Sequence, residues 1–205
     1  MIDEKDLAAA LGQIKAKVLH GPFSRCVAFH HLVSIPQVQG VVSRPQPLWG
    51  MGSQRFGGRL TPRNSFETIY LAEDPVTALA EVTGVVRNIG GSLLNLQSQP
   101  WVVVTVQGIL RCVLDLTEAS AVSQLGSNHQ ELTGEWRYTQ EQLGEAPTQL
   151  LGRVCYHTGL FDGIRYPSSK NLPDGACLAV FPDRLKAPAF LEVYDPNGNL
   201  AQRLP

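Results

Sequence analysis

The sequence predicts a mixed α+β fold, and three observations carry this prediction. Hydrophobic residues make up 43% of the 205-residue chain and charged residues 17%, a balance typical of a packed core. Helical and strand patterns both occur, because apolar residues recur every three or four positions in some segments and form β-branched runs in others. These segments do not alternate as regular β–α–β units, which favours α+β over a doubly wound parallel sheet.

The first predicted element is an N-terminal helix over residues 1–20, followed by one domain over residues 21–205. The apolar residues of the helix recur at spacings of four, three and four on a single stripe: Leu7, Leu11, Ile14 and Val18. Asp3 is the expected N-cap, and the Gly-Pro pair at 21–22 ends the run. Residues 21–67 are rich in Gly, Pro, Ser and Arg, and long irregular segments of this kind are often functional.

The middle of the chain carries sharper signals. Residues 68–72 predict a strand, and Asp74 followed by Pro75 predicts the N-cap and first residue of a helix over 75–87. Residues 101–106 and 109–116 are β-branched runs separated by Gln-Gly, which predicts a pair of strands.

The last third of the chain begins with Thr117, the expected cap of a short helix, and a polar stretch over 126–146. Pro147 opens a helix that ends near Gly159. The remaining predictions are strands at 163–166, 176–181 and 190–193, a turn at 195–198 and edge structure in the tail.

Composition and charge exclude several classes of protein. The formal net charge is −1, without the basic patch that binding to a nucleic-acid backbone requires. No apolar run approaches the roughly 18 residues that span a membrane, and the acidic, polar N-terminus does not resemble a signal peptide, so a cytoplasmic protein is expected. Four scattered cysteines without a CxxC pair predict buried thiols in a reducing compartment, and no metal site is expected.

Three blocks of sequence resemble the RES domain family, which is named for its Arg, Glu and Ser residues. They are GPFSR (21–25), GGRLTPRNSFETIYLAEDPVTALAE (57–81) and FDGIRYPSSKNLPDGACLAVF (161–181), and they occur in the family's order. The resemblance implies a fold similar to ADP-ribosyltransferases, with a split, mainly antiparallel sheet, flanking helices and a cleft between the halves. It also implies a toxin-type enzyme that takes NAD as its substrate, and an antitoxin partner of the Xre helix-turn-helix type; a homodimer is left open.

The resemblance assigns the catalytic carboxylate to Glu81 and the nicotinamide pocket to Tyr70. Cleavage of the nicotinamide–ribose bond builds an oxocarbenium-like cation, which a nearby carboxylate stabilises. From the residues alone, an exposed helix glutamate is the favoured interpretation of Glu81, and the resemblance reverses this preference. For Tyr70 the alternative is a core tyrosine of a strand.

Two arginines are the candidates for holding the pyrophosphate, since a guanidinium matches phosphate geometry. Arg25 occupies the family's first Arg position and is also assigned to catalysis, and Arg59 follows two glycines that allow a close backbone approach to a ligand. Arg55 and Arg63 lie nearby and could share this role. The alternative for each arginine is a solvated loop.

The family serine is assigned to Ser168, with Ser169 as the alternative within one residue of register. Its hydroxyl is expected to bind phosphate or ribose, whereas the alternative is a serine that shapes the turn after Pro167. Cys26 and Cys177 stand where many relatives carry an aromatic residue and an Asn, respectively.

The resulting hypothesis is an NAD-cleaving enzyme that transfers ADP-ribose to water or phosphate. Protein ADP-ribosylation would use the same residues together with a protein-docking surface. A non-catalytic module that binds NAD or an antitoxin is the alternative from a different class.

Overall fold

The structure is a computed structural model that describes residues 1–32, 45–83, 86–87, 93–94 and 100–205. The helices are α1 (Glu4–Leu11), α2 (Met51–Phe56), α3 (Pro75–Thr83), α4 (Ala119–Gln124), α5 (His129–Thr133), α6 (Trp136–Leu143) and α7 (Pro147–Thr158). The strands are β1 (Lys17–His20), β2 (Phe23–Ala28), β3 (Ile69–Ala72), β4 (Val86–Arg87), β5 (Leu93–Leu94), β6 (Trp101–Asp115), β7 (Gly163–Pro167), β8 (Ala176–Val180), β9 (Phe190–Val193) and β10 (Arg203–Leu204). None of these helices is long and apolar enough to cross a membrane.

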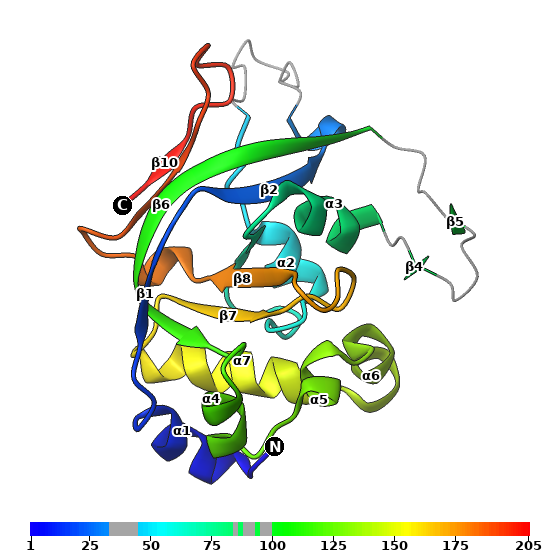
Figure 1. The fold of residues 1–205 in the computed structure, drawn as a ribbon, viewed down its shortest axis with the longest axis vertical. Helices are drawn as coiled ribbons and strands as arrows, with labels where there is room; N and C mark the ends of the chain where they lie inside the picture. Colours follow the sequence, from blue (N-terminus) through cyan, green and yellow to red (C-terminus); the bar gives the residue numbers. More distant parts are fainter. Residues whose placement is uncertain (33–44, 84–85, 88–92, 95–99) are drawn as a thin grey trace.

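The large sheet has the order β10-β9-β6-β2-β3-β8-β7, with β1 also paired to β6. Its strand pairs are antiparallel except for β6 and β7, which run parallel. The long, curved β6 extends past β2, β9, β1 and β7 in turn, so that the strands β6-β2-β3-β8-β7 form a closed cycle (Figure 1). The predicted α+β fold with a mainly antiparallel sheet is therefore confirmed.

The sheet divides between β2 and β3. These two strands pair through Ser24 and Ala72, whereas β2 pairs with β6 along its whole length and β3 pairs with β8 from Ile69 onwards. Beyond the Ser24–Ala72 pair, the two strands part, and residues of both line a cleft. The expected split thus falls between the second and third strands.

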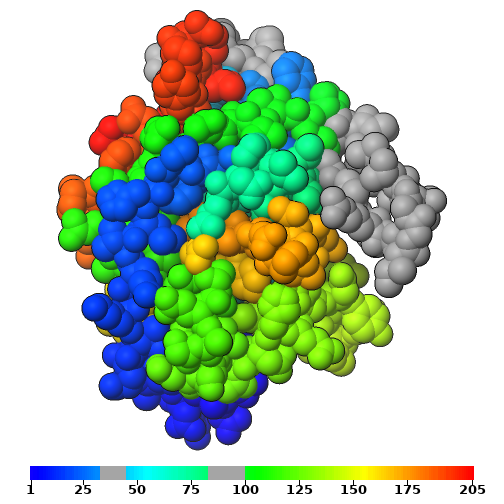
Figure 2. Space-filling view, viewed as in Figure 1, coloured from blue at the N-terminus to red at the C-terminus, as the bar shows by residue number. Residues whose placement is uncertain are grey.

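Two cores lie on the two faces of the strands. On β3, Tyr70 and Ala72 pack toward a first core together with Leu7, Leu11 and Leu151 of helices α1 and α7. The alternate side chains of β3 belong to a second core, which is formed mainly by strands β2, β6, β8 and β9. In Figures 1 and 2, α1 and the last strands lie toward opposite ends of the long axis.

The N-terminal helix is shorter than predicted. It begins after Asp3 and buries Leu7 and Leu11 as expected, but it ends at Leu11. Residues 17–20 form β1 against β6, and Val18 is largely exposed. The prediction over 12–20 was wrong because pairing with a distant strand outweighed a helical spacing.

Gln107 and Gly108 do not separate two strands, since β6 runs through them. Gly108 pairs with Leu191 of β9, and its carbonyl accepts a hydrogen bond from the Gly21 amide at 2.9 Å. A glycine within a strand is here a place of close backbone approach rather than a turn.

Two other boundaries differ from the predictions. Helix α3 ends at Thr83, although a helix to residue 87 was expected, and Val86–Arg87 forms β4. Thr117 does not cap α4, because this helix begins after Glu118. The Thr117 amide donates instead to the Asp115 carboxylate at 3.0 Å.

Several local signals were correct. The Thr77 amide donates to the Asp74 carboxylate at 2.9 Å, so Asp74 caps α3 as predicted. Helix α7 begins at Pro147 and ends before Gly159, and β9 has the predicted bounds. The tail forms β10 at the edge of the sheet.

Candidate active site

A cleft of about 790 Å³ opens where β2 and β3 part. This volume falls in the range of about 300–1,000 Å³ typical of ligand pockets. Strands β2, β3 and β8, the end of α3, and helices α2 and α6 contribute its walls. Four of the five residues proposed from the sequence line it: Arg25, Arg59, Tyr70 and Glu81. Another cleft, of about 660 Å³ beside α4 and α5, contains none of the five.

Arg25 is held at one wall of the cleft by a single hydrogen bond from Nη2 to the Trp49 carbonyl, at 2.7 Å. Its Nη1 is buried and has no hydrogen-bond partner among the described residues. Burial lowers the pKa of Arg25 to about 10, against an opposing contribution from Glu67, so the guanidinium remains charged at neutral pH. A buried charged donor without a partner is costly, and an anionic ligand would satisfy it.

Arg59 is more firmly fixed. Its Nη1 donates to the carbonyls of Leu132 and Gly134 at 2.9 and 2.8 Å, and its Nη2 donates to Ser169 Oγ at 2.9 Å. The residue is 8% exposed, and none of the ion pairs found in the described ranges neutralises it. Arg59 is therefore a preorganised positive charge at the cleft.

Tyr70 lies beside the turn that carries Arg59. Its hydroxyl accepts a hydrogen bond from the Leu60 amide at 3.0 Å and lies 2.9 Å from Thr61 Oγ1. Burial raises the pKa of Tyr70 to about 12, so the phenol stays neutral. A Cβ on Gly58 would come within 2.4 Å of the Tyr70 hydroxyl, which means that this glycine makes room for the tyrosine ring.

Glu81 projects from α3 and is oriented by Ser168. The serine Oγ donates to Glu81 Oε1 at 2.6 Å and accepts hydrogen bonds from the amides of Lys170 and Asn171 at 3.1 and 3.0 Å. Ser168 is fully buried and does not line the cleft. Its hydroxyl is therefore engaged in three hydrogen bonds within the protein, one of them to Glu81.

The two serines that the sequence left as alternatives support different residues. Ser168 bonds Glu81, whereas Ser169 bonds Arg59. Of the two further arginines that could share the role, Arg63 lines the cleft and pairs with Glu141 at 3.7 Å, but Arg55 is not among the lining residues.

Cys26 and Cys177 both line the cleft, and burial raises the pKa of each thiol. Neither is therefore an activated thiolate. His31 also lines the cleft, although no group of three His, Cys, Asp or Glu side chains that could bind a metal occurs in the described part of the chain.

Three tryptophans in the cleft were not singled out from the sequence as site residues: Trp49, Trp101 and Trp136. The indole Nε1 of Trp101 is buried without a hydrogen-bond partner in the described structure. The guanidinium of Arg137 lies 4.8 Å from the Trp136 ring centroid. Trp136 and Arg137 fall in a stretch that reads as polar surface, and only its packing beside Arg59 brings it to the site.

The cleft thus combines fixed guanidinium groups, aromatic rings and one oriented carboxylate. Arginines suit an anionic ligand, rings suit a flat one, and the carboxylate suits a centre that becomes positive. The protein is thus a small α+β domain whose cleft is lined by arginines, aromatic rings and a carboxylate.

Comparison with protein families then identifies the chain. The model of the RES domain matches residues 32–201, and the protein belongs to this family. Among solved structures, a chain of the MbcT–MbcA toxin–antitoxin complex of M. tuberculosis is similar, with a TM-score of 0.62 and 17% identity over 98% of this chain and 92% of that one. At this identity the likeness shows the fold. Comparison with curated proteins finds no matching sequence.

Proposed function

We propose that this protein binds NAD in the cleft and breaks the bond between nicotinamide and ribose. The observation that supports the proposal is the convergence of Arg25, Arg59 and Glu81 on the same cleft. Arg25, with its unpartnered buried Nη1, and Arg59 supply positive charge for a pyrophosphate, and Glu81 supplies the negative charge that a ribosyl cation requires.

The chemistry assigns each side chain a role. The C–N bond breaks with its electron pair going to the pyridinium nitrogen, so nicotinamide leaves as a neutral molecule. The Glu81 carboxylate stabilises the oxocarbenium-like ribose, and a water or phosphate oxygen then bonds to the anomeric carbon and loses a proton to solvent. Tyr70 lines the nicotinamide pocket, and Ser168 acts through Glu81 by holding its orientation.

The proposed reaction is tested by incubating the purified protein with NAD, with and without phosphate, and identifying the products by mass. Free nicotinamide together with ADP-ribose indicates hydrolysis, and phosphorylated ADP-ribose in the phosphate sample indicates phosphorolysis. A mass increase on a protein would indicate ADP-ribosyl transfer. NAD that binds without turnover would contradict catalysis and support a binding module.

We further propose that the protein is the toxin of a toxin–antitoxin pair, acting in the cytoplasm. Family membership and the similar fold of a chain from a toxin–antitoxin complex support this proposal. An enzyme that consumes NAD requires restraint, and a partner that buries the cleft would provide it. The partner proposed is a small helix-turn-helix protein of the Xre type.

Expression of this chain alone in bacteria should slow growth while cellular NAD falls. A Glu81→Gln variant expressed to the same level is the matched control, and it should leave both growth and NAD near normal. Normal growth despite falling NAD would argue against the toxin role, whereas unchanged NAD would count against the enzyme.

A further inference from the structure

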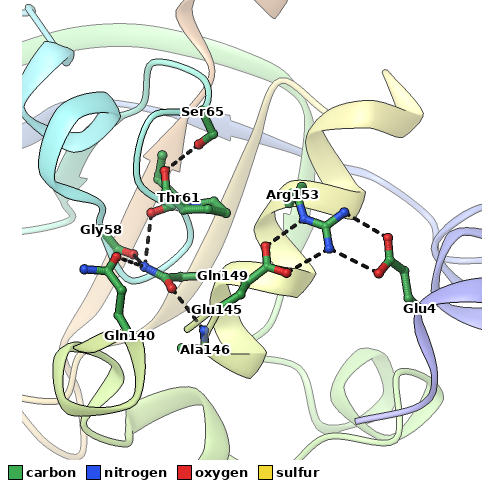
Figure 3. Close-up of polar contacts among 10 residues, drawn as sticks. Glu4, Gly58, Thr61, Ser65, Gln140, Glu145, Ala146, Gln149 and Arg153 are labelled. Atoms are coloured by element: carbon green, nitrogen blue, oxygen red, sulfur yellow. Dashed lines mark hydrogen bonds and ion pairs between the residues drawn. The ribbon is translucent and has the colours of Figure 1, made fainter. Parts of the chain in front are cut away.

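The first turn of α7 contacts the turn that carries Arg59. Gln149 is fully buried there, and its Nε2 donates to the carbonyls of Gly58 and Thr61 at 3.0 and 3.2 Å (Figure 3). Its Oε1 accepts a hydrogen bond from the Ala146 amide at 3.0 Å. One side chain thus joins the start of a helix to both ends of a four-residue turn.

That turn positions two residues of the cleft. It is closed by backbone hydrogen bonds between Gly58 and Thr61, at 2.8 and 3.3 Å, and Arg59 lies within it. The Leu60 amide and Thr61 hydroxyl contact the Tyr70 hydroxyl. A shift of the turn would therefore move the Arg59 guanidinium and release the Tyr70 phenol.

A second contact fixes the same turn against the same helix. A Cβ on Gly152 would lie 1.9 Å from the Leu60 carbonyl oxygen, so the helix backbone and the turn meet directly. Gln149 and Gly152, three residues apart, face the turn from one side of α7. The helix is the rigid body against which the turn is set.

We propose that Gln149 is a positioning residue, which holds Arg59 at the geometry that binds the pyrophosphate of NAD. The inference rests on the proposed function and extends it to a residue outside the cleft. Gln149 touches no ligand, because it is fully buried and is not among the residues that line the cleft. It acts through the turn, by donating to the Gly58 and Thr61 carbonyls on either side of Arg59 in addition to the backbone hydrogen bonds that close the turn.

The test is a double-mutant cycle on NAD affinity. Gln149→Met keeps the length of the side chain but removes the donor, and it should weaken NAD binding by about tenfold, in the range of measured couplings between connected residues. In an Arg59→Ala background, the same change should weaken NAD binding much less, because the Arg59 guanidinium is absent and only the effect through Tyr70 remains. In kinetics, KM should rise more than kcat falls, since a ground-state contact is lost.

Arg153→Ala is the matched control on the same helix. Arg153 joins α7 to Glu4 and Glu145 at 2.8 and 2.7 Å, away from the turn (Figure 3). Its loss should lower the thermal midpoint slightly and leave NAD affinity unchanged. If Gln149→Met does not fold, Gln149→Glu carries the test: the protonated acid can donate to a carbonyl, so NAD affinity should approach the wild-type value as the pH falls.

The outcomes separate the two proposals. Wild-type protein that does not bind NAD would overturn the proposed function, and this inference with it. Wild-type binding that Gln149→Met leaves unchanged, or weakens equally in both backgrounds, would overturn the inference alone.

Discussion

Replacing Glu81 with Gln should lower the turnover of NAD by about a hundredfold or more, while the affinity for NAD changes far less. The substitution keeps the size of the side chain and an oxygen that can accept the Ser168 hydrogen bond, but it removes the negative charge. Loss of one electrostatic group aimed at a transition state costs on the order of 3 kcal/mol. A charge needed only in the transition state affects kcat rather than binding.

Turnover, NAD affinity and thermal midpoint should be measured together for this variant. The free energy of unfolding should change by less than about 1 kcal/mol, because the hydrogen bond can be retained. Glu118→Gln, an exposed carboxylate paired with Lys17 at 2.8 Å, is the control and should leave turnover intact. Undiminished turnover in Glu81→Gln would show that Glu81 is an ordinary helix glutamate without a catalytic role.

Removal of the serine behind Glu81 should give a weaker and mixed phenotype. Ser168→Ala leaves the Glu81 carboxylate without its donor and the amides of Lys170 and Asn171 without their acceptor. Stability should fall by about 1–3 kcal/mol and turnover by less than in Glu81→Gln. A ligand-binding serine would instead mainly change NAD affinity.

Replacing Arg59 with Ala should weaken both the fold and NAD binding. The change removes three hydrogen bonds, to the Leu132 carbonyl, the Gly134 carbonyl and the Ser169 hydroxyl, and the Gly134 carbonyl keeps only the Trp136 amide as a donor. The free energy of unfolding should fall by about 3 kcal/mol, since buried groups that lose a charged partner are costly. NAD affinity should fall by about tenfold or more with the loss of a pyrophosphate contact.

Denaturant unfolding and calorimetric titration with NAD separate these two effects. Arg203→Ala serves as the comparison, because Arg203 is exposed, lies 4.5 Å from the Phe190 ring centroid and is not among the residues that line the cleft. Unchanged NAD affinity in a destabilised Arg59→Ala protein would show that Arg59 has a structural role only. Pyrophosphate binding would then have to be assigned to Arg25 and Arg63.

The elements that the sequence predicted well depend on neighbours along the chain. Asp74 caps α3 by accepting a hydrogen bond from the Thr77 amide, three residues further along the chain. Pro147 and Gly159 mark the start and end of α7 through their own backbone preferences. The errors at residues 17–20 and at Gly108 have the opposite origin. Both segments are decided by strands far away in the sequence, which no local pattern reveals.

The same division holds for the candidate site. Resemblance to a family supplied the residue types, and four of those residues line one cleft. The hydrogen-bond partners that hold these residues could not be predicted, because Arg59 bonds groups that lie 73, 75 and 110 residues further along the chain. Gln149 reads as an ordinary polar helix residue until the helix is docked on the turn.

The closed cycle of strands determines how far translation must proceed before the candidate site can form. Strands β7 and β8 complete the cycle, and the residues that hold Glu81 and Arg59 follow directly on β7. A nascent chain that stops before residue 168 has the arginines and the glutamate but lacks the two serines that bond Glu81 and Arg59, and its strand edges are open to aggregation. Unfinished chains are therefore inert, and the proposed activity begins only late in translation.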